Sequence, residues 1–136
     1  MSLQDFFQES FENVEEIEEK LMFGGKERTF RFRPISADKG EEIRKSSRSI
    51  SIKKGKRQIN FDQDGYMERL IIETTVHPNF KNEELQKNWN VLGATDLLRA
   101  MKQKMLDGEY TKLIEIVNEV NGYNQSAEFE VEEIKN

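Results

Sequence analysis

The chain has 136 residues, of which 35% are hydrophobic and 35% are charged. This length suits one domain spanning residues 1–136, and the composition is that of a polar globular protein. The chain has no cysteine, which excludes disulfides and thiolate metal sites. No apolar run is long enough to cross a bilayer and the N-terminus has no signal-peptide pattern, so we expect a cytoplasmic protein.

The net charge of −5 is unevenly distributed. Residues 5–19 contain seven acidic residues and no basic one, whereas residues 39–57 contain eight basic residues and two acidic ones. Three interpretations of the basic segment stay open: a solvated loop that neutralises the acidic N-terminal segment, a docking patch for an acidic partner, and a nucleic-acid contact. We rank nucleic acid last because the chain is acidic overall and has no zinc finger or RNA-recognition motif.

The first twelve residues are acidic and aromatic. Leu3, Phe7 and Phe11 recur at a spacing that permits a short amphipathic helix. Phenylalanines this close to a terminus must dock on something, or the segment frays. We expect them to dock on their own domain in preference to a partner. If they do not dock, residues 1–12 are flexible, as we expect for residues 124–136.

Residues 18–23 and 29–34 predict a β-hairpin. Phe30 and Phe32 alternate with arginines, which predicts that the phenylalanines face a core. Gly24–Gly25 supplies a turn without steric cost.

A helix start follows, with Asp38 and Glu41 in capping-box positions. Residues 44–58 then predict either a second, basic hairpin or a mobile excursion. Four apolar residues alternate with polar ones on the two sides of a Lys-Gly-Lys turn: Ile50, Ile52, Ile59 and Phe61.

The remainder predicts about four short helices. Asp64 is the expected N-cap of the first, and His77–Pro78 is expected to stop it. A second begins at Lys81 or Asn82 and runs through Trp89. The buried stripe expected on the first helix is Met67, Leu70, Ile71 and Thr74.

Thr95 is the expected N-cap of the third helix, and Asp107–Gly108 is expected to end it. The fourth helix should run over residues 109–120 and close with a left-handed residue at Asn121–Gly122. Phe129 and Val131 alternate with glutamates as an edge strand or a solvated tail would. The fold class is therefore α+β, with N-terminal hairpins followed by a bundle of short helices.

No residue pattern supports catalysis or a cofactor. His77 is the only histidine, and no nucleophile elbow or glycine-rich phosphate loop is present. One histidine without cysteine makes a zinc site improbable. The Asp62–Gly65 segment lacks the glycine position of a calcium loop. We expect no enzymatic activity, no cofactor and no metal.

Short motifs are spread over nearly the whole chain: Leu3-Gln4-Asp5-Phe6, Phe30-Arg31-Phe32-Arg33-Pro34-Ile35, Asn79-Phe80-Lys81, Glu84-Leu85-Gln86-Lys87, Val91, Gly93, Ala94 and Asp96-Leu97-Leu98, Gly108-Glu109-Tyr110 with Leu113, and Asn121-Gly122-Tyr123. Together they resemble the XkdN-like phage tail assembly chaperones. Two departures are Trp89, where the family more often has tyrosine followed by glycine, and the run RAMKQKML, which lacks a usual proline.

The resemblance implies a non-enzymatic protein of a tailed phage or prophage that acts in the host cytoplasm. Such proteins are thought to coat the helical tape-measure protein, to bring tail-tube subunits to it, and to leave before the virion is mature. Apolar helix stripes would serve this task, although the same stripes suit a core. The candidate partner-binding residues are Leu97, Leu98, Met101, Met105 and Leu113, with Trp89 and Tyr110 at the rim. The alternative is a nucleic-acid-binding regulator that uses residues 39–57.

Overall fold

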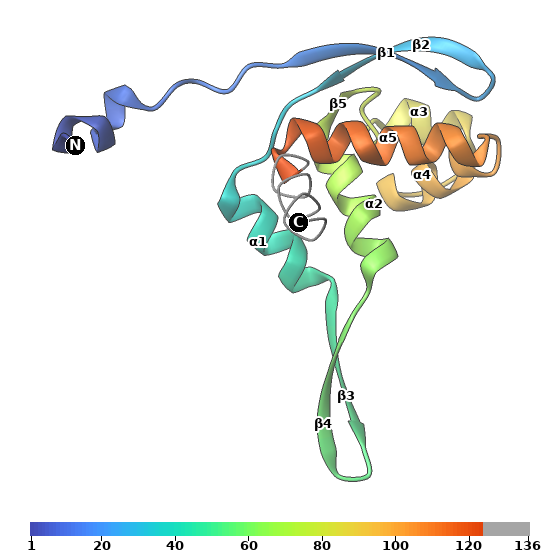
Figure 1. Cartoon of the computed structure of the whole chain (residues 1–136). Coiled ribbons are helices and arrows are strands. Elements are labelled where there is room, and N and C mark those ends of the chain that lie inside the picture. The colour runs from blue at the N-terminus through green and yellow to red at the C-terminus, as the bar shows by residue number, and fades with distance from the viewer. Residues whose placement is uncertain (124–136) are drawn as a thin grey trace, which may run out of the picture.

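A computed structural model describes residues 1–123 of the chain (Figure 1). The edge strand or tail expected around Phe129 and Val131, and the flexibility expected for residues 124–136, lie outside the described residues. In chain order the elements are the 3₁₀ turns η1 (Leu3–Phe6) and η2 (Gln8–Ser10), then β1 (Ile17–Phe23), β2 (Lys26–Phe32), α1 (Ala37–Ser46), β3 (Arg48–Lys53), β4 (Lys56–Phe61), α2 (Gln63–Thr74), β5 (Thr75–His77), α3 (Glu83–Asn88), α4 (Ala94–Lys102) and α5 (Asp107–Val120).

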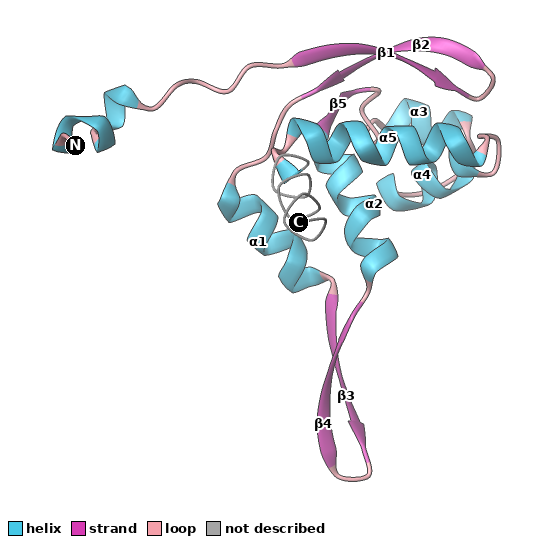
Figure 2. Ribbon diagram, viewed as in Figure 1, coloured by secondary structure: helices cyan, strands magenta, loops and turns pink. Residues whose placement is uncertain are grey.

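The architecture is α+β, as the sequence predicts. One sheet has the strand order β1-β2-β5, and β3 and β4 form a separate two-stranded ribbon. Figure 2 shows β1–β2 along one side of the helical body and β3–β4 projecting from the opposite side, between α1 and α2. The N-terminal segment extends away from the body. No helix within residues 1–123 is long and apolar enough to cross a membrane.

The first hairpin forms where the sequence predicts it. Its antiparallel register runs from Ile17 opposite Phe32 to Phe23 opposite Lys26. Gly24 and Gly25 make the turn with φ of +68° and +81°, a region that glycine occupies without strain. Phe30 and Phe32 are buried, as expected from their alternation with exposed arginines.

A third strand replaces the expected end of α2. The helix ends at Thr74, and the next three residues form β5, which pairs antiparallel with β2 through Arg31–His77 and Phe32–Thr75. Thr75 and Val76 are β-branched and suit a strand better than a helix. The helix was predicted to continue to His77–Pro78. This prediction was wrong for the last three residues before Pro78, which form β5.

The N-caps of α1 and α2 lie two residues earlier than predicted. Ser36, not Asp38, caps α1 by accepting the backbone N–H of Lys39 at 3.1 Å. Asp62, not Asp64, caps α2 by accepting the N–H of Gly65 at 3.0 Å. A cap must have extended backbone and lie just outside the first turn, and Asp38 and Asp64 already lie inside their helices.

The starts of the last two helices also differ from the prediction. Gly93 holds the N-cap position of α4 with φ of +101° and no side-chain bond, whereas Thr95 lies inside the helix. Helix α5 begins at Asp107, so this residue starts a helix and does not merely break one. Gly122 has φ of +83°, which confirms the left-handed residue expected after α5.

The core lies between the three-stranded sheet and helices α2, α4 and α5. It combines the inward face of β1–β2 with one stripe from each helix. Its buried members are Leu21, Phe23, Phe30, Phe32, Leu70, Ile71, Ile72, Phe80, Leu97, Leu98, Met101, Leu113, Ile116 and Val117.

Asn121, the C-cap of α5, joins three parts of this body. Its Oδ1 accepts the backbone N–H of Ile35 at 2.9 Å, and its Nδ2 donates to Thr74 Oγ1 at 3.0 Å and to the Val117 carbonyl at 2.9 Å. The end of the last helix is thereby fixed to the segment after β2 and to the end of α2.

The N-terminal segment does not dock on its own domain, contrary to expectation. It forms only the two 3₁₀ turns, followed by an irregular stretch up to β1. The side chains there are between 43% and 74% exposed to solvent: Leu3, Phe6, Phe7 and Phe11. An isolated helix this short is marginal in water, which explains why helical spacing alone does not produce an α-helix here.

The basic segment forms a hairpin, the first of the two predicted alternatives. Its antiparallel register runs from Arg48–Phe61 to Lys53–Lys56. Lys54 and Gly55 form the turn with φ of +52° and +75°, and positive φ at both positions is what a two-residue turn of type I′ requires. At its base the N–H of Asp62 donates to the Ser47 carbonyl at 2.8 Å.

Candidate partner-binding pocket

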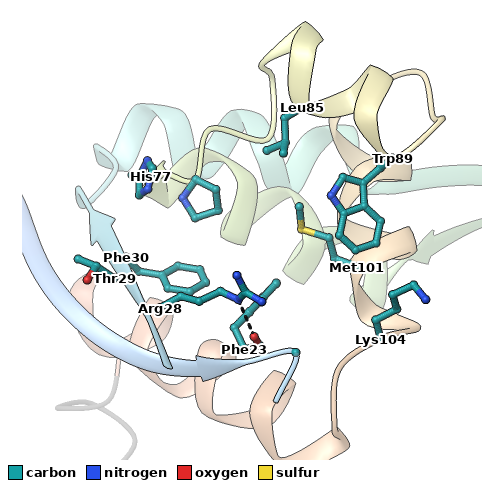
Figure 3. A pocket seen from close by; sticks show the side chains of 11 residues that line it. Phe23, Arg28, Thr29, Phe30, His77, Leu85, Trp89, Met101 and Lys104 are labelled. Carbon is teal, nitrogen blue, oxygen red and sulfur yellow. Dashed lines mark hydrogen bonds between the residues drawn. The ribbon is translucent and has the colours of Figure 1, made fainter. Parts of the chain in front are cut away.

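A cavity of about 480 Å³ opens between the β1–β2 hairpin and helices α3 and α4 (Figure 3). Its volume falls within the range of about 300–1,000 Å³ typical of ligand pockets. The residues that line it come from β1–β2, the β5–α3 connection, α3 and the α4–α5 region: Phe23, Gly24, Arg28, Thr29, Phe30, His77, Pro78, Leu85, Trp89, Met101 and Lys104.

The inner surface of the pocket is apolar and continuous with the core. Phe23, Phe30 and Met101 are buried, and the rings of Phe23 and Phe30 lie 5.2 Å apart at an angle of 57°. Leu85 and Trp89 are partly buried and project from α3 towards the cavity (Figure 3). An apolar side chain of a partner placed here would contact core residues directly.

The rim of the pocket is basic. Arg28, His77 and Lys104 are exposed there, and no acidic residue is among the lining side chains. Arg28 Nε donates to the Phe23 carbonyl at 2.8 Å, which holds the guanidinium along the hairpin. Such a rim favours a partner that carries carboxylates next to its apolar residues.

Glu109 fixes the hairpin tip that forms one wall of the pocket. Its two carboxylate oxygens accept the backbone N–H groups of Gly24 and Gly25, each at 3.1 Å, and Oε1 also accepts the N–H of Leu106 at 2.8 Å. The bond from Leu106 is the main cause that lowers the pKa of Glu109; burial opposes it, and the bonds from Gly25 and Gly24 reinforce it.

Gln86 orients α3, which carries Leu85 and Trp89. Its Nε2 donates to the Phe80 carbonyl at 2.9 Å, and its Oε1 accepts the N–H of Gly93 at 3.1 Å. The buried amide therefore ties this short helix to the loops on both sides of it.

A family model described as "Phage XkdN-like tail assembly chaperone protein" matches residues 3–135. The chain belongs to this family.

Relatives of this XkdN-like chaperone occur in Bacillus subtilis (strain 168). The chain is 28% identical to uncharacterized protein YqbN over 108 residues, covering 79% of this chain and 71% of that protein. It is 25% identical to the phage-like element PBSX protein XkdN over 108 residues, covering 79% and 72%. The crystal structure of YqbN has the same fold, with a TM-score of 0.67, 22% identity, and coverage of 90% of this chain and 97% of that chain.

Most of the residues predicted to contact a partner lie in the core of this XkdN-like chaperone. Leu97 and Leu98 have 0% exposure, Leu113 has 1% and Met101 has 5%. The apolar faces of α4 and α5 cover the sheet and α2, so of the two uses that the sequence left open, these four side chains serve the core. A partner can reach these four side chains only where the pocket exposes the edge of Met101.

The three remaining predicted residues are partly buried. Trp89 lines the pocket together with Met101. Met105 and Tyr110 pack against the core outside it. Three pocket residues were not predicted: Arg28, Leu85 and Lys104. Leu85 lies in the Glu84-Leu85-Gln86-Lys87 motif and Arg28 lies just after the Gly24–Gly25 turn, whereas Lys104 carried no local signal. The partner-binding role of the predicted set stays a prediction.

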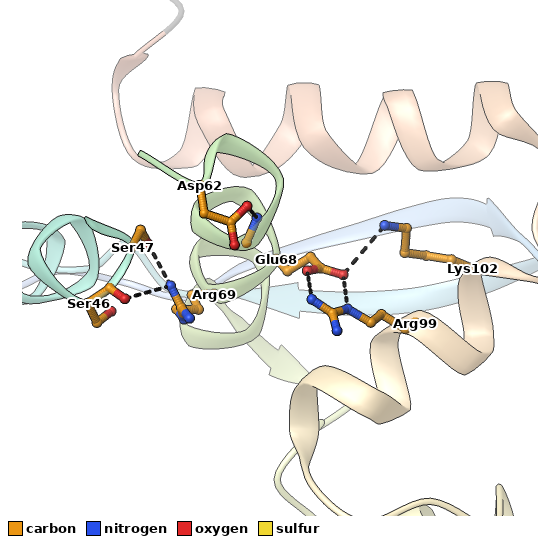
Figure 4. A network of polar contacts seen from close by, with 8 residues as sticks. Ser46, Ser47, Asp62, Glu68, Arg69, Arg99 and Lys102 are labelled. Carbon is orange, nitrogen blue, oxygen red and sulfur yellow. Dashed lines mark hydrogen bonds and ion pairs between the residues drawn. The ribbon is translucent and has the colours of Figure 1, made fainter. Parts of the chain in front are cut away.

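A polar network joins Glu68 of α2 to Arg99 and Lys102 of α4 (Figure 4), and Tyr110 of α5 lies next to it. Glu68 is 3% exposed and accepts two bonds from the Arg99 guanidinium, each at 2.9 Å, while Lys102 Nζ lies 3.5 Å from it. Burial alone would raise the pKa of Glu68, but the bonds and charges of these two cations lower it. Lys102 Nζ also lies 4.5 Å from the centre of the Tyr110 ring.

Burial, and then the negative charges of Glu68 and Asp64, raise the pKa of Tyr110 to about 12. Tyr110 therefore stays neutral and acts as a packing and cation-binding ring in this network. Within residues 1–123, no three histidine, aspartate or glutamate side chains gather into a group that could hold a metal ion.

Proposed function

We propose that this XkdN-like chaperone binds the tape-measure protein of a tailed phage or prophage in the host cytoplasm. In this proposal it keeps that protein soluble, brings tail-tube subunits to it, and is absent from the mature virion. It acts by holding other proteins and not by catalysis. Family membership supports the general task, and the open apolar pocket with its basic rim supports the mode of binding.

The pocket suits an amphipathic helix. Such a helix presents anchors at positions i, i+3, i+4 and i+7 to an apolar groove. One apolar anchor would enter beside Trp89 and Met101, and carboxylates one turn away would meet Arg28 and Lys104. A single anchor gives weak binding, but many copies along one long helix give a stable and still displaceable coat.

Co-expression with the tape-measure protein tests this function. Wild-type chain is expected to co-purify with the tape-measure protein and to increase its soluble fraction. Trp89→Ala removes the largest side chain at the mouth, and Lys104→Glu reverses one rim charge. Both should lower the recovered tape-measure protein several-fold.

Lys87→Glu is the matched control for Lys104→Glu, because Lys87 is exposed on α3 but does not line the pocket. It should bind as wild type does. Wild-type chain that neither co-purifies nor improves solubility contradicts the function. Binding that survives both pocket variants contradicts the pocket as its site.

A further inference from the structure

The β3–β4 hairpin presents an exposed apolar face, on which only Phe61 has a ring contact among the described residues, with Tyr66 at 5.6 Å. Residues opposite each other in an antiparallel pair share a face, and Ile50 lies opposite Ile59 while Phe61 lies opposite Arg48. Ile50, Ile52, Ile59 and Phe61 therefore lie on one face, and their exposures are 57%, 76%, 70% and 45%. An isolated two-stranded hairpin is only marginally stable in water. An exposed apolar patch on a folded protein commonly marks a binding site, so we expect a partner to cover this face.

The charges of the hairpin define the chemistry of that partner. Residues 48–61 contain no acidic side chain, and Arg48 and Arg57 share the apolar face, opposite Phe61 and Ile52. Lys53 and Lys56 lie opposite each other on the other face, and Lys54 lies in the turn at the tip. A suitable partner segment is apolar or aromatic and carries several carboxylates.

The N-terminal segment, residues 1–16, has this composition. It carries five acidic residues and no basic one, and among the described residues its only ion pair joins Glu16 to Arg31 at 3.6 Å. Its apolar side chains Leu3, Phe6, Phe7, Phe11 and Val14 are all exposed. The chain thus has two exposed surfaces that both carry apolar side chains and have opposite charge.

We propose that residues 1–16 of one copy dock on the apolar face of the β3–β4 hairpin of a second copy. The segment leaves β1 in a direction away from its own hairpin (Figure 1), which favours contact between copies. The aromatic rings would cover the isoleucines while the carboxylates face Arg48 and Arg57 on the same face and Lys54 at the tip. Each copy supplies one segment and one hairpin, so the contact is heterologous and can continue from copy to copy.

This contact uses none of the pocket residues and does not rest on the proposed function. Two variants, mixed after purification, test it. Phe6→Ser/Phe7→Ser damages only the segment, and Ile50→Ser/Ile59→Ser damages only the hairpin face. All four side chains are exposed, so the helical body should fold in both variants, which circular dichroism checks.

Sedimentation equilibrium of the full chain at about 100 µM, where a micromolar contact is saturated, gives the result. Wild type should exceed the 16.0 kDa monomer mass. Each variant alone should be monomeric, and an equimolar mixture should reach twice that mass, because one variant still supplies a hairpin and the other still supplies a segment. Ser51→Ala/Gln58→Ser, on the opposite face, should associate as wild type does.

Three outcomes overturn the proposal. The first is a wild type that is monomeric at this concentration, the second is a mixture of variants that stays monomeric, and the third is a variant that associates alone as strongly as wild type does. A monomeric chain whose hairpin amide signals shift on deletion of residues 1–16 would show docking within one chain. A monomeric chain that retards nucleic acid with steep salt dependence would assign the hairpin to that ligand.

Discussion

The carboxylate of Glu109 connects the last helix to the first hairpin through three backbone N–H groups. Glu109→Gln replaces one acceptor oxygen with a donor and removes the charge. We expect this variant to unfold at lower urea concentration than wild type at pH 7, because at least one of these N–H groups loses its partner. Glu27→Gln, at an exposed position on β2, is the matched control.

The pH dependence of this difference follows from the lowered pKa of Glu109. A carboxyl group with a lowered pKa in the folded state contributes stability that is complete above its unfolded pKa of about 4.3 and is lost as the pH falls through the folded pKa. The stability difference between wild type and Glu109→Gln should therefore shrink below about pH 4. Urea titrations at several pH values measure it, and a constant difference down to pH 2 would contradict the assignment.

The buried carboxylate of Glu68 is stabilised by Arg99 and Lys102, which are more exposed to solvent. Glu68→Gln keeps the side-chain shape but loses the charge-assisted bonds to Arg99, which should cost about 1–3 kcal/mol. We expect a loss of unfolding free energy at the lower end of this range, because Arg99 is exposed to solvent and the solvent screens the ion pair. Chemical unfolding of Glu68→Gln beside Glu27→Gln measures the cost, and equal stability of the two variants would show that the network adds nothing.

At the scale of elements, the apolar stripes of α4 and α5 form the core. Leu98→Ala should therefore cost about 2–5 kcal/mol of unfolding free energy, as large-to-small core substitutions do. Leu92→Ala, at a residue that is 89% exposed in the neighbouring loop, should change it by less than about 0.5 kcal/mol. Thermal or urea unfolding of the two variants compares them directly. Similar small losses would mean that α4 packs loosely.

The sequence predicts these elements because their apolar residues keep a strict period. Phe30 and Phe32 alternate with arginines, and Leu113, Ile116 and Val117 keep helical spacing, so both elements lie where expected. Strand β5 escapes prediction because three residues carry no period of their own. Its pairing with β2 joins residues more than forty positions apart, and only tertiary contact creates it.

The pocket was only partly predictable, because contacts between distant parts of the chain also determine which side chains line it. Trp89 and Met101 could be named as candidates, but a helix stripe looks the same whether it faces the core or a partner. Burial of Leu97, Leu98 and Leu113 depends on α2 and the sheet, which lie far away in the chain. Arg28 and Lys104 reach the same rim from a hairpin and an interhelical loop, and nothing in their local sequence links them.

At the scale of the whole molecule, the β3–β4 hairpin is a separable part. Its two ends meet at the Ser47–Asp62 hydrogen bond, and Arg69 also binds this base through the Ser46 carbonyl at 3.2 Å and Ser47 Oγ at 2.7 Å. Replacement of residues 49–60 by a short Asn-Gly turn should leave the body folded. Helical circular dichroism should be retained, whereas association between copies should be lost.

Loss of the helical signal in this deletion would show that the hairpin supports α1 and α2. Retained association would show that copies meet through another surface. The two readouts are independent, because one measures the body and the other measures the face formed by Ile50 and Ile59.

The bonds of Asn121 have a consequence for how the protein is made. This residue joins the exit of β2, the end of α2 and the end of α5. During synthesis β1 and β2 are made before α5, which packs on β1 and holds its turn through Glu109. The phenylalanines of the first hairpin therefore stay uncovered until α5 has been made, and a ribosome that stalls before α5 leaves a product that cannot close its core.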